Sequence, residues 1–143
     1  MTQRIFQLRS LSHYNGEKND VSTLNIELLH GDNWEPFDLN VETAGFLIFV
    51  YAIFTCQHLY MRVNAAENGI VLNSASGGII VTTAEDWNLE SIEVSYDCEV
   101  KSGDFSATTI DYIISRMKAC PVSLNIRKDI EIDARVSMHY SGS

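Results

Sequence analysis

Three cysteines, Cys56, Cys98 and Cys120, are the residues with the clearest chemical potential in this chain. A thiol can attack an electrophile, bind a metal ion or form a disulfide, and its surroundings decide which. The number is odd, and no two cysteines have the C-x2-C spacing of a zinc site. The four histidines are scattered as well. We therefore expect neither a structural disulfide framework nor a metal site, and no bound cofactor.

Cys120 stands directly before Pro121, at the point where a helical pattern stops. Proline disfavours helical geometry at the residue before it, so the helix should end there and a short turn over 121–126 should follow. Thr108 and Asp111 have the spacing of a capping box at the start of this helix. Its apolar stripe comprises Ile110, Ile113, Ile114 and Met117, and Cys120 continues it.

Cys56 lies inside a longer helical pattern that runs from Thr43 to about Glu67. The apolar run 44–55 within it is too short to cross a bilayer, which takes about 20 residues. We expect a helix buried on most sides, capped by Asn40 or Thr43 and ended by Asn68-Gly69. The predicted stripe comprises Phe49, Ala52, Ile53, Cys56, Leu59, Tyr60 and Val63, with Gln57, His58 and Arg62 off it.

The rest of the chain alternates between apolar and polar residues, which is typical of strands. The segments are 5–12, 21–29, 35–41, 77–83, 91–100 and 130–139. Cys98 falls on the apolar face of its strand, where it is expected to act as a small core residue. The order of three strands, a long helix, two strands, two helices and a strand favours an α+β fold with mostly antiparallel pairing.

Length and charge limit the function. A chain of 143 residues predicts a single domain, 1–143. A formal net charge of −9 argues against nucleic acid and anionic membrane surfaces as partners. The N-terminal segment lacks the apolar core of a signal peptide, so we expect a cytoplasmic protein. The wide apolar faces of the two helices favour a homodimer.

Both Cys56 and Cys120 project from the apolar face of a helix. If the two helices pack together, the sulfur atoms could approach within the range of a disulfide. The other interpretation, which spacing alone favours, is that both are small hydrophobic residues of the core. The residues by themselves leave these alternatives open.

The run Ala119-Cys120-Pro121-Val122-Ser123, about 64 residues after Cys56, resembles the OsmC/Ohr superfamily. Members of that family have a first Cys inside the central helix and a second in a C-P-[VIY]-S motif after the second long helix. The element order agrees from about residue 20 to the end. The resemblance implies an OsmC-like α+β fold, with antiparallel sheets around a long central helix in an intertwined homodimer.

It also implies a peroxiredoxin-like thiol peroxidase of bacterial antioxidant defence that reduces organic hydroperoxides. Cys56 would be the peroxidatic thiolate, which becomes a sulfenic acid, and Cys120 would resolve it as a disulfide. A dithiol reductant would then restore both thiols. Phe49, Ile53 and Tyr60 would line an apolar path for the substrate, although their positions are equally typical of a core.

The chain departs from the family at two positions. The peroxidase branch has a Glu ten residues before the first Cys, and this Glu holds an Arg from the N-terminal hairpin. Here that position is Phe46, with Glu42 one turn further back, and the hairpin offers only Lys18 and Arg9. We expect a weakened or redirected peroxidase. The alternative is a non-catalytic OsmC-like protein that senses redox state or binds a small apolar ligand.

Overall fold

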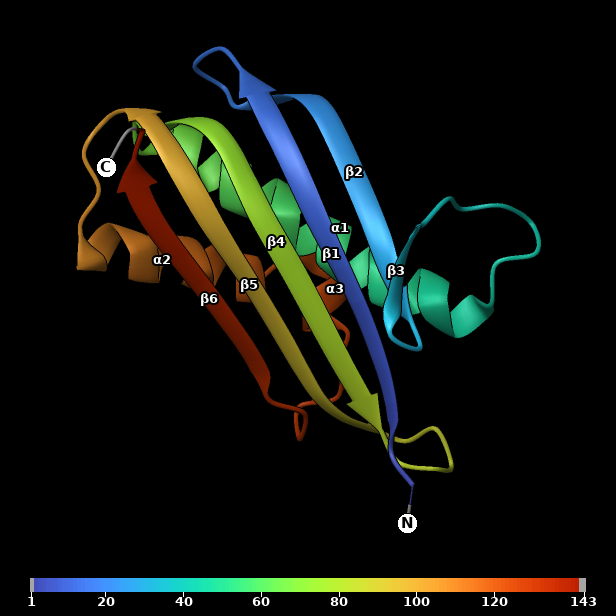
Figure 1. Cartoon of the computed structure of the whole chain (residues 1–143). Coiled ribbons are helices and arrows are strands. Elements are labelled where there is room, and N and C mark those ends of the chain that lie inside the picture. Colours follow the sequence, from blue (N-terminus) through green and yellow to red (C-terminus); the bar gives the residue numbers. More distant parts are fainter. Residues whose placement is uncertain (1, 142–143) are drawn as a thin grey trace.

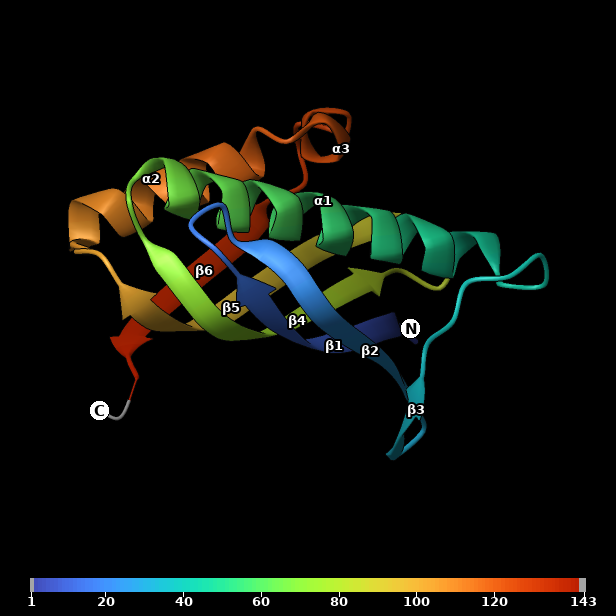
Figure 2. The ribbon, with the colours of Figure 1, turned by 90° about the horizontal axis from the view of Figure 1, so that it is seen from above.

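The computed structural model describes residues 2–141, which form one six-stranded sheet with three helices. Figure 1 gives their arrangement, and Figure 2 shows all three helices on the same face of the sheet. The elements in chain order are β1 (Arg4–Asn15), β2 (Asp20–His30), β3 (Asn33–Pro36), α1 (Gly45–Glu67), β4 (Val71–Thr83), β5 (Leu89–Ser102), α2 (Ala107–Lys118), α3 (Pro121–Leu124) and β6 (Ile132–Tyr140). This is the predicted order, and the α+β class is confirmed.

The sheet has the strand order β3-β2-β1-β4-β5-β6. Every neighbouring pair is antiparallel except β5 and β6, which are parallel because the chain crosses between them through α2 and α3. The prediction of mostly antiparallel pairing is therefore confirmed. The described part of one chain folds into a single sheet.

The start of α1 differs from the prediction. β3 ends at Pro36, so the third strand is earlier and shorter than 35–41. The side chains of Asn40 and Thr43 bond backbone amides within the turn that precedes the helix. They are therefore not available as caps, and Ala44 occupies the N-cap without a side-chain hydrogen bond. The predicted end at Asn68-Gly69 is confirmed, since Asn68 is the C-cap and Gly69 has a φ of 76°.

The start of α2 was predicted two residues too late. The N-cap is Ser106, whose hydroxyl accepts a hydrogen bond from the Thr109 amide at 3.1 Å. Thr108 and Asp111 have capping-box spacing but lie inside the helix. The predicted end is right, because α2 stops at Lys118 and the backbone at Cys120 is extended.

α1 faces the sheet with a different side from the predicted one. Its buried residues are Val50, Ile53, Phe54, Gln57, His58, Met61, Asn64 and Ala65. The predicted stripe is rotated from this face by about a third of a turn, and Leu59 within it is 42% exposed. The helix is apolar nearly all round, so apolar spacing could not mark the buried side, and three of the buried residues are polar.

By length and composition alone, α1 is apolar enough to cross a membrane. In the fold it packs on the sheet, as the core helix of a soluble protein does, and its buried face carries Gln57, His58 and Asn64. Polar groups on a buried face are stable only where hydrogen bonds satisfy them. The protein supplies such partners for His58 and for the amide nitrogen of Gln57.

A hydrogen-bonded cluster fixes α1 on β1. The Tyr14 hydroxyl lies 2.7 Å from both the His58 Nε2 atom and the Ser12 hydroxyl. The imidazole stacks on the Tyr96 ring, with ring centroids 5.6 Å apart. Burial, with a smaller contribution from nearby Arg62, lowers the pKa of His58 from 6.5 to about 4. The imidazole is therefore neutral at pH 7.

This cluster should make stability depend on pH. The pKa of His58 is lower in the folded state than in the unfolded state, so the unfolded state takes up the proton first as pH falls. The contribution to stability is complete above pH 6.5 and is lost as pH approaches 4. We expect His58 to account for a loss of about 2 to 3 kcal/mol between pH 7.5 and 4.5.

Urea unfolding of the wild-type chain and of His58→Gln at both pH values would measure this loss. The carboxylates titrate in both proteins and cancel in the comparison, so the wild-type chain should lose more stability than the variant. Equal losses would contradict a buried neutral His58.

Candidate active site

Cys56 lies on the flank of α1, between its buried side and its exposed side, and its thiol is partly accessible. This flank faces α3, as the hydrogen bond between Cys56 and the Val122 amide demonstrates. Because the helix packs on the sheet through another side, Cys56 is free to meet residues from the second half of the chain. The prediction that Cys56 lies on the main core face is therefore wrong, but its position still serves a site.

Cys120 is brought to the same place by the break between two helices. It is fully buried, follows the end of α2, and is the N-cap of α3. Pro121 occupies the first turn of α3, where its missing amide hydrogen has no cost. The amide of Val122 is in the same turn and has no partner inside the helix, so it is available to Cys56.

The structure brings the two predicted thiols together. The Cys120 side chain and the Val122 amide both lie near enough to the Cys56 sulfur to shift its pKa. On its other side, the Cys120 thiol donates to the Ser123 hydroxyl at 3.0 Å. One short helical turn therefore contacts both sulfur atoms, and both cysteines are free thiols.

The protonation of Cys56 follows from these contacts. Burial raises the pKa of Cys56 above its ordinary value, the Val122 amide lowers it, and the neighbouring Cys120 thiol raises it further. The net shift is upward, so Cys56 is mainly a thiol at neutral pH. None of the described groups that shift this pKa is a cation.

The two candidate cations from the N-terminal hairpin lie elsewhere. Arg9 pairs with Glu27 at 2.7 Å and stacks over Trp34, on the sheet face opposite the helices. It is on that face because its neighbour Leu8 is buried under the helices and side chains alternate along a strand. Glu42 lies in the exposed turn before α1 rather than in the helix.

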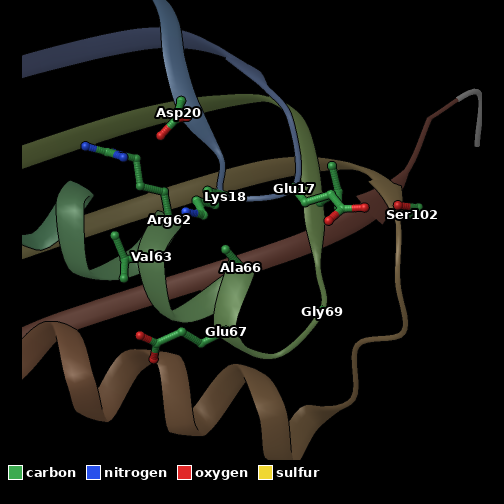
Figure 3. Close-up of a pocket in the computed structure, with 10 residues that line it drawn as sticks. Glu17, Lys18, Asp20, Arg62, Val63, Ala66, Glu67, Gly69 and Ser102 are labelled. Atoms are coloured by element: carbon green, nitrogen blue, oxygen red, sulfur yellow. The ribbon is translucent and has the colours of Figure 1, made fainter.

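Lys18 lines a pocket of about 710 Å³ between the β1–β2 turn and the end of α1, shown in Figure 3. Glu17 and Asp20 from the turn, and Arg62 and Glu67 from α1, also line it. Arg62 follows Cys56 by six residues, which is about 9 Å along the helix axis. Cys56 and Cys120 are not among the lining residues, so this pocket is separate from the thiols.

The position of the family Glu is occupied by an aromatic cluster. The ring of Phe46 lies 4.7 Å from that of Phe6, 5.4 Å from Phe49 and 5.5 Å from Trp87, measured between centroids. A carboxylate in this apolar setting would be desolvated without a partner. The surroundings of Phe46 therefore offer no setting for an ion pair.

Three residues near the thiols were not found from the sequence as parts of a site. Gln57 and Ser123 are buried and bonded to each other beside Cys120. Arg116, four residues before Cys120, holds its guanidinium carbon 5.9 Å from the ring centroid of Tyr60, which is one turn beyond Cys56. Arg116 precedes Cys120 by four residues, and Tyr60 follows Cys56 by four, so helical spacing could have suggested Arg116. The contact of Gln57 with Ser123 joins segments far apart in sequence, so no local spacing could have suggested it.

A second pocket, of about 410 Å³, lies near the start of α1, and Cys56 and Cys120 do not line it either. Phe49, two turns before Cys56 on the same flank of α1, lines it together with Ile126, which follows α3. The other lining residues are Phe46, Trp87, Asn88, Leu89, Asn125 and Arg127. Of the predicted apolar path, Phe49 borders this pocket, Tyr60 packs against Arg116, and Ile53 is buried in the core.

The third thiol takes no part in this site. Cys98 on β5 is fully buried, and its sulfur lies 3.8 Å from that of Met61. Burial raises the pKa of Cys98 to about 12, so it is a neutral core residue, as predicted. In the described part of the chain, no group of three or more His, Cys, Asp or Glu side chains could hold a metal ion.

The sequence matches no protein-family model and no curated protein. Solved structures do match. An OsmC-like protein from Mycoplasma pneumoniae aligns with a TM-score of 0.54 at 14% identity, over 90% of this chain and 94% of that one. An OsmC-like hydroperoxide resistance protein from Jannaschia sp. CCS1 aligns with a TM-score of 0.55 at 12% identity, over 85% of each chain. The resemblance drawn from the cysteine motif is confirmed at the level of architecture, and this chain has the OsmC-like fold.

Proposed function

We propose that the chain is a member of the OsmC/Ohr superfamily that reduces hydroperoxides, above all organic ones, with Cys56 and Cys120 as its redox pair. The proximity of these two thiols, which is close enough for Cys120 to shift the pKa of Cys56, is the observation that carries the proposal. A pair in contact can close a disulfide with little movement of the backbone. The name of the similar Jannaschia protein, which refers to hydroperoxide resistance, supports the same direction.

The proposed cycle has three balanced steps. The Cys56 thiolate attacks the O–O bond of the hydroperoxide, which leaves a sulfenic acid on Cys56 and, after uptake of one proton, an alcohol. The Cys120 thiol then attacks the sulfenic sulfur, forming the disulfide and releasing water. A dithiol reductant opens the disulfide through a mixed disulfide, restores both thiols and is itself oxidised.

The alkyl group of the substrate would occupy the 410 Å³ pocket. Phe49 connects this pocket to the flank of α1 that carries Cys56, and Phe46, Leu89 and Ile126 give it an apolar wall opposite the polar side chains of Asn88, Asn125 and Arg127. Apolar walls favour an alkyl or aryl hydroperoxide over hydrogen peroxide, because the hydrophobic effect then adds to binding.

Replacing either proposed redox residue should abolish turnover for different reasons. Cys56→Ser removes the attacking sulfur, so consumption of cumene hydroperoxide with a dithiol reductant should stop. Cys120→Ser leaves the sulfenic acid unresolved, so one equivalent of hydroperoxide should react and a sulfenic-acid trap such as dimedone should label Cys56. Cys98→Ala is the matched control and should turn over like the wild-type chain, because Cys98 is buried beside Met61. Steady turnover by Cys56→Ser would refute the assignment.

The raised pKa of Cys56 predicts a slow, strongly pH-dependent reaction. Because the thiolate fraction is small at neutral pH, the rate of the first step should rise about tenfold per pH unit from pH 7 to 8.5. Stopped-flow measurement of sulfenic acid formation would show this slope. A rate that is already constant above pH 7 and equals that of a dedicated peroxidase would exclude the attenuated mechanism.

A second candidate function is redox sensing by the same pair, because the proximity of Cys56 and Cys120 would also allow a single reversible disulfide closure. A sensor is oxidised once and stays oxidised until it is reduced, whereas an enzyme consumes many equivalents of peroxide. Thiol titration after mild peroxide treatment, with and without a dithiol reductant, separates these functions. Stoichiometric loss of two thiols without continued peroxide consumption would identify the sensor.

We also propose that the protein is a cytoplasmic homodimer. α1 presents an exposed apolar stripe away from the sheet, in which Ile48 is 43% and Leu59 is 42% exposed. Beside the helix, Val21 and Leu24 on the helix-facing side of β2 are 37% and 39% exposed. A second copy of the chain would cover both apolar surfaces.

A charge placed on this surface should prevent assembly. Light scattering should give the wild-type chain twice its mass of 16.1 kDa, and Leu59→Glu or Leu24→Glu should reduce this to a single chain. Ile5→Glu is the matched control, because Ile5 is 64% exposed and lies on the opposite face of the sheet. A monomeric wild-type chain would contradict the proposal.

A further inference from the structure

Gln57 is an unusual residue for the core of this protein. Its side chain is fully buried under α3, and its Oε1 atom has no hydrogen-bond partner among the described residues. A leucine or methionine of similar volume would fill the space without leaving a buried acceptor unpaired. Packing alone therefore does not explain why this buried position carries an amide side chain.

The hydrogen bond that the Nε2 atom of Gln57 donates explains the amide. It donates to the Ser123 hydroxyl at 3.1 Å, and the same oxygen accepts the proton of the Cys120 thiol at 3.0 Å. Both lone pairs of the Ser123 oxygen are thus taken by donors. Ser123 is itself only 5% exposed, so water is a poor substitute for either donor.

We propose that Gln57 and Ser123 form a hydrogen-bond relay that positions Cys120 for disulfide closure. This inference rests on the proposed redox role of the two thiols. The bond to Ser123 directs the S–H of Cys120 away from Cys56, so a sulfur lone pair faces the Cys56 sulfur. When Cys120 loses its proton, the Ser123 hydroxyl turns and donates to the thiolate. Gln57 holds the Ser123 oxygen in place during this reversal and strengthens its O–H as a donor.

The relay acts in one step only, which is the attack of Cys120 on an oxidised Cys56. With an aromatic disulfide as the oxidant, Cys56 first displaces one aromatic thiolate and forms a mixed disulfide. Cys120 then attacks the Cys56 sulfur, the Cys56–Cys120 disulfide forms, and the second aromatic thiolate leaves with the electrons of the broken bond. The proton of Cys120 passes to the solvent.

This two-step release can be followed with 5,5′-dithiobis(2-nitrobenzoate), without any hydroperoxide. The full chain with Cys98→Ala gives a background that contains only the two thiols of the site. Ser123→Ala should slow the second release about ten- to hundredfold, since a hydrogen bond to a charged group is worth about that factor. Gln57→Leu should slow it several-fold. The first release should stay unchanged in both.

Controls separate positioning from folding. Ser123→Thr keeps the hydroxyl and should recover most of the rate, whereas Ser115→Ala, which removes an exposed hydroxyl on α2, should have no effect. Gln57→Leu should unfold at the same urea concentration as the background or higher, so it carries the test if Ser123→Ala folds poorly. Unchanged second-release rates in both variants, or first and second rates slowed equally, would overturn the relay.

The same assay separates this inference from the proposed function. A chain that closes its disulfide through the relay but consumes no hydroperoxide would refute the peroxidase and keep the relay. A chain that consumes hydroperoxide but whose second release is unchanged by Ser123→Ala and Gln57→Leu would keep the peroxidase and refute the relay.

Discussion

The candidate site depends on one turn of α3 against the flank of α1. The amide of Val122 bonds the sulfur of Cys56, and the hydroxyl of Ser123 bonds the thiol of Cys120. Pro121 makes this geometry possible, because it ends the helical conformation at Cys120 and starts a new turn at once. The sequence C-P-V-S therefore has a physical meaning at each position. The cysteine supplies a sulfur, the proline sets the turn, the third residue offers an unpaired amide and the serine offers a hydroxyl.

The electrostatics of the site distinguish this chain from the peroxidase pattern that its motif resembles. Burial raises the pKa of Cys56, and no described cation offsets this effect. Arg9 is engaged with Glu27 on the far face of the sheet, and Phe46, ten residues before Cys56, packs its ring against Phe6. These differences are consistent with each other, because an arginine without its carboxylate would be a poorly held charge. The polar interactions of the site are instead the hydrogen bonds around Cys120. They favour the second step of the proposed chemistry, the attack of Cys120 on the oxidised Cys56, more than the first step, the attack of Cys56 on the hydroperoxide.

The same helix also carries the polar cluster of the core. His58 bonds Tyr14 on β1 from the sheet-facing side of α1, while Gln57 bonds Ser123 from the side that faces α3. Two adjacent residues thus tie α1 to the first strand and to the last helix. This arrangement fixes the rotation of a helix whose apolar residues alone would allow several orientations. It therefore also fixes the direction in which Cys56 points.

The sequence by itself determined the order of the elements, the class of the fold, the break at Pro121 and the core position of Cys98. These follow from local periodicity and from the backbone restrictions of proline, which operate within a few residues. The tertiary structure alone decided which side of α1 is buried, since apolar residues surround that helix, and it placed Gln57 and His58 inside against their polarity. It also decided that Cys56 meets Cys120 and that Arg9 does not face them. Such contacts join segments some 50 to 65 residues apart, and their geometry is set by how a helix packs on a sheet rather than by any local pattern.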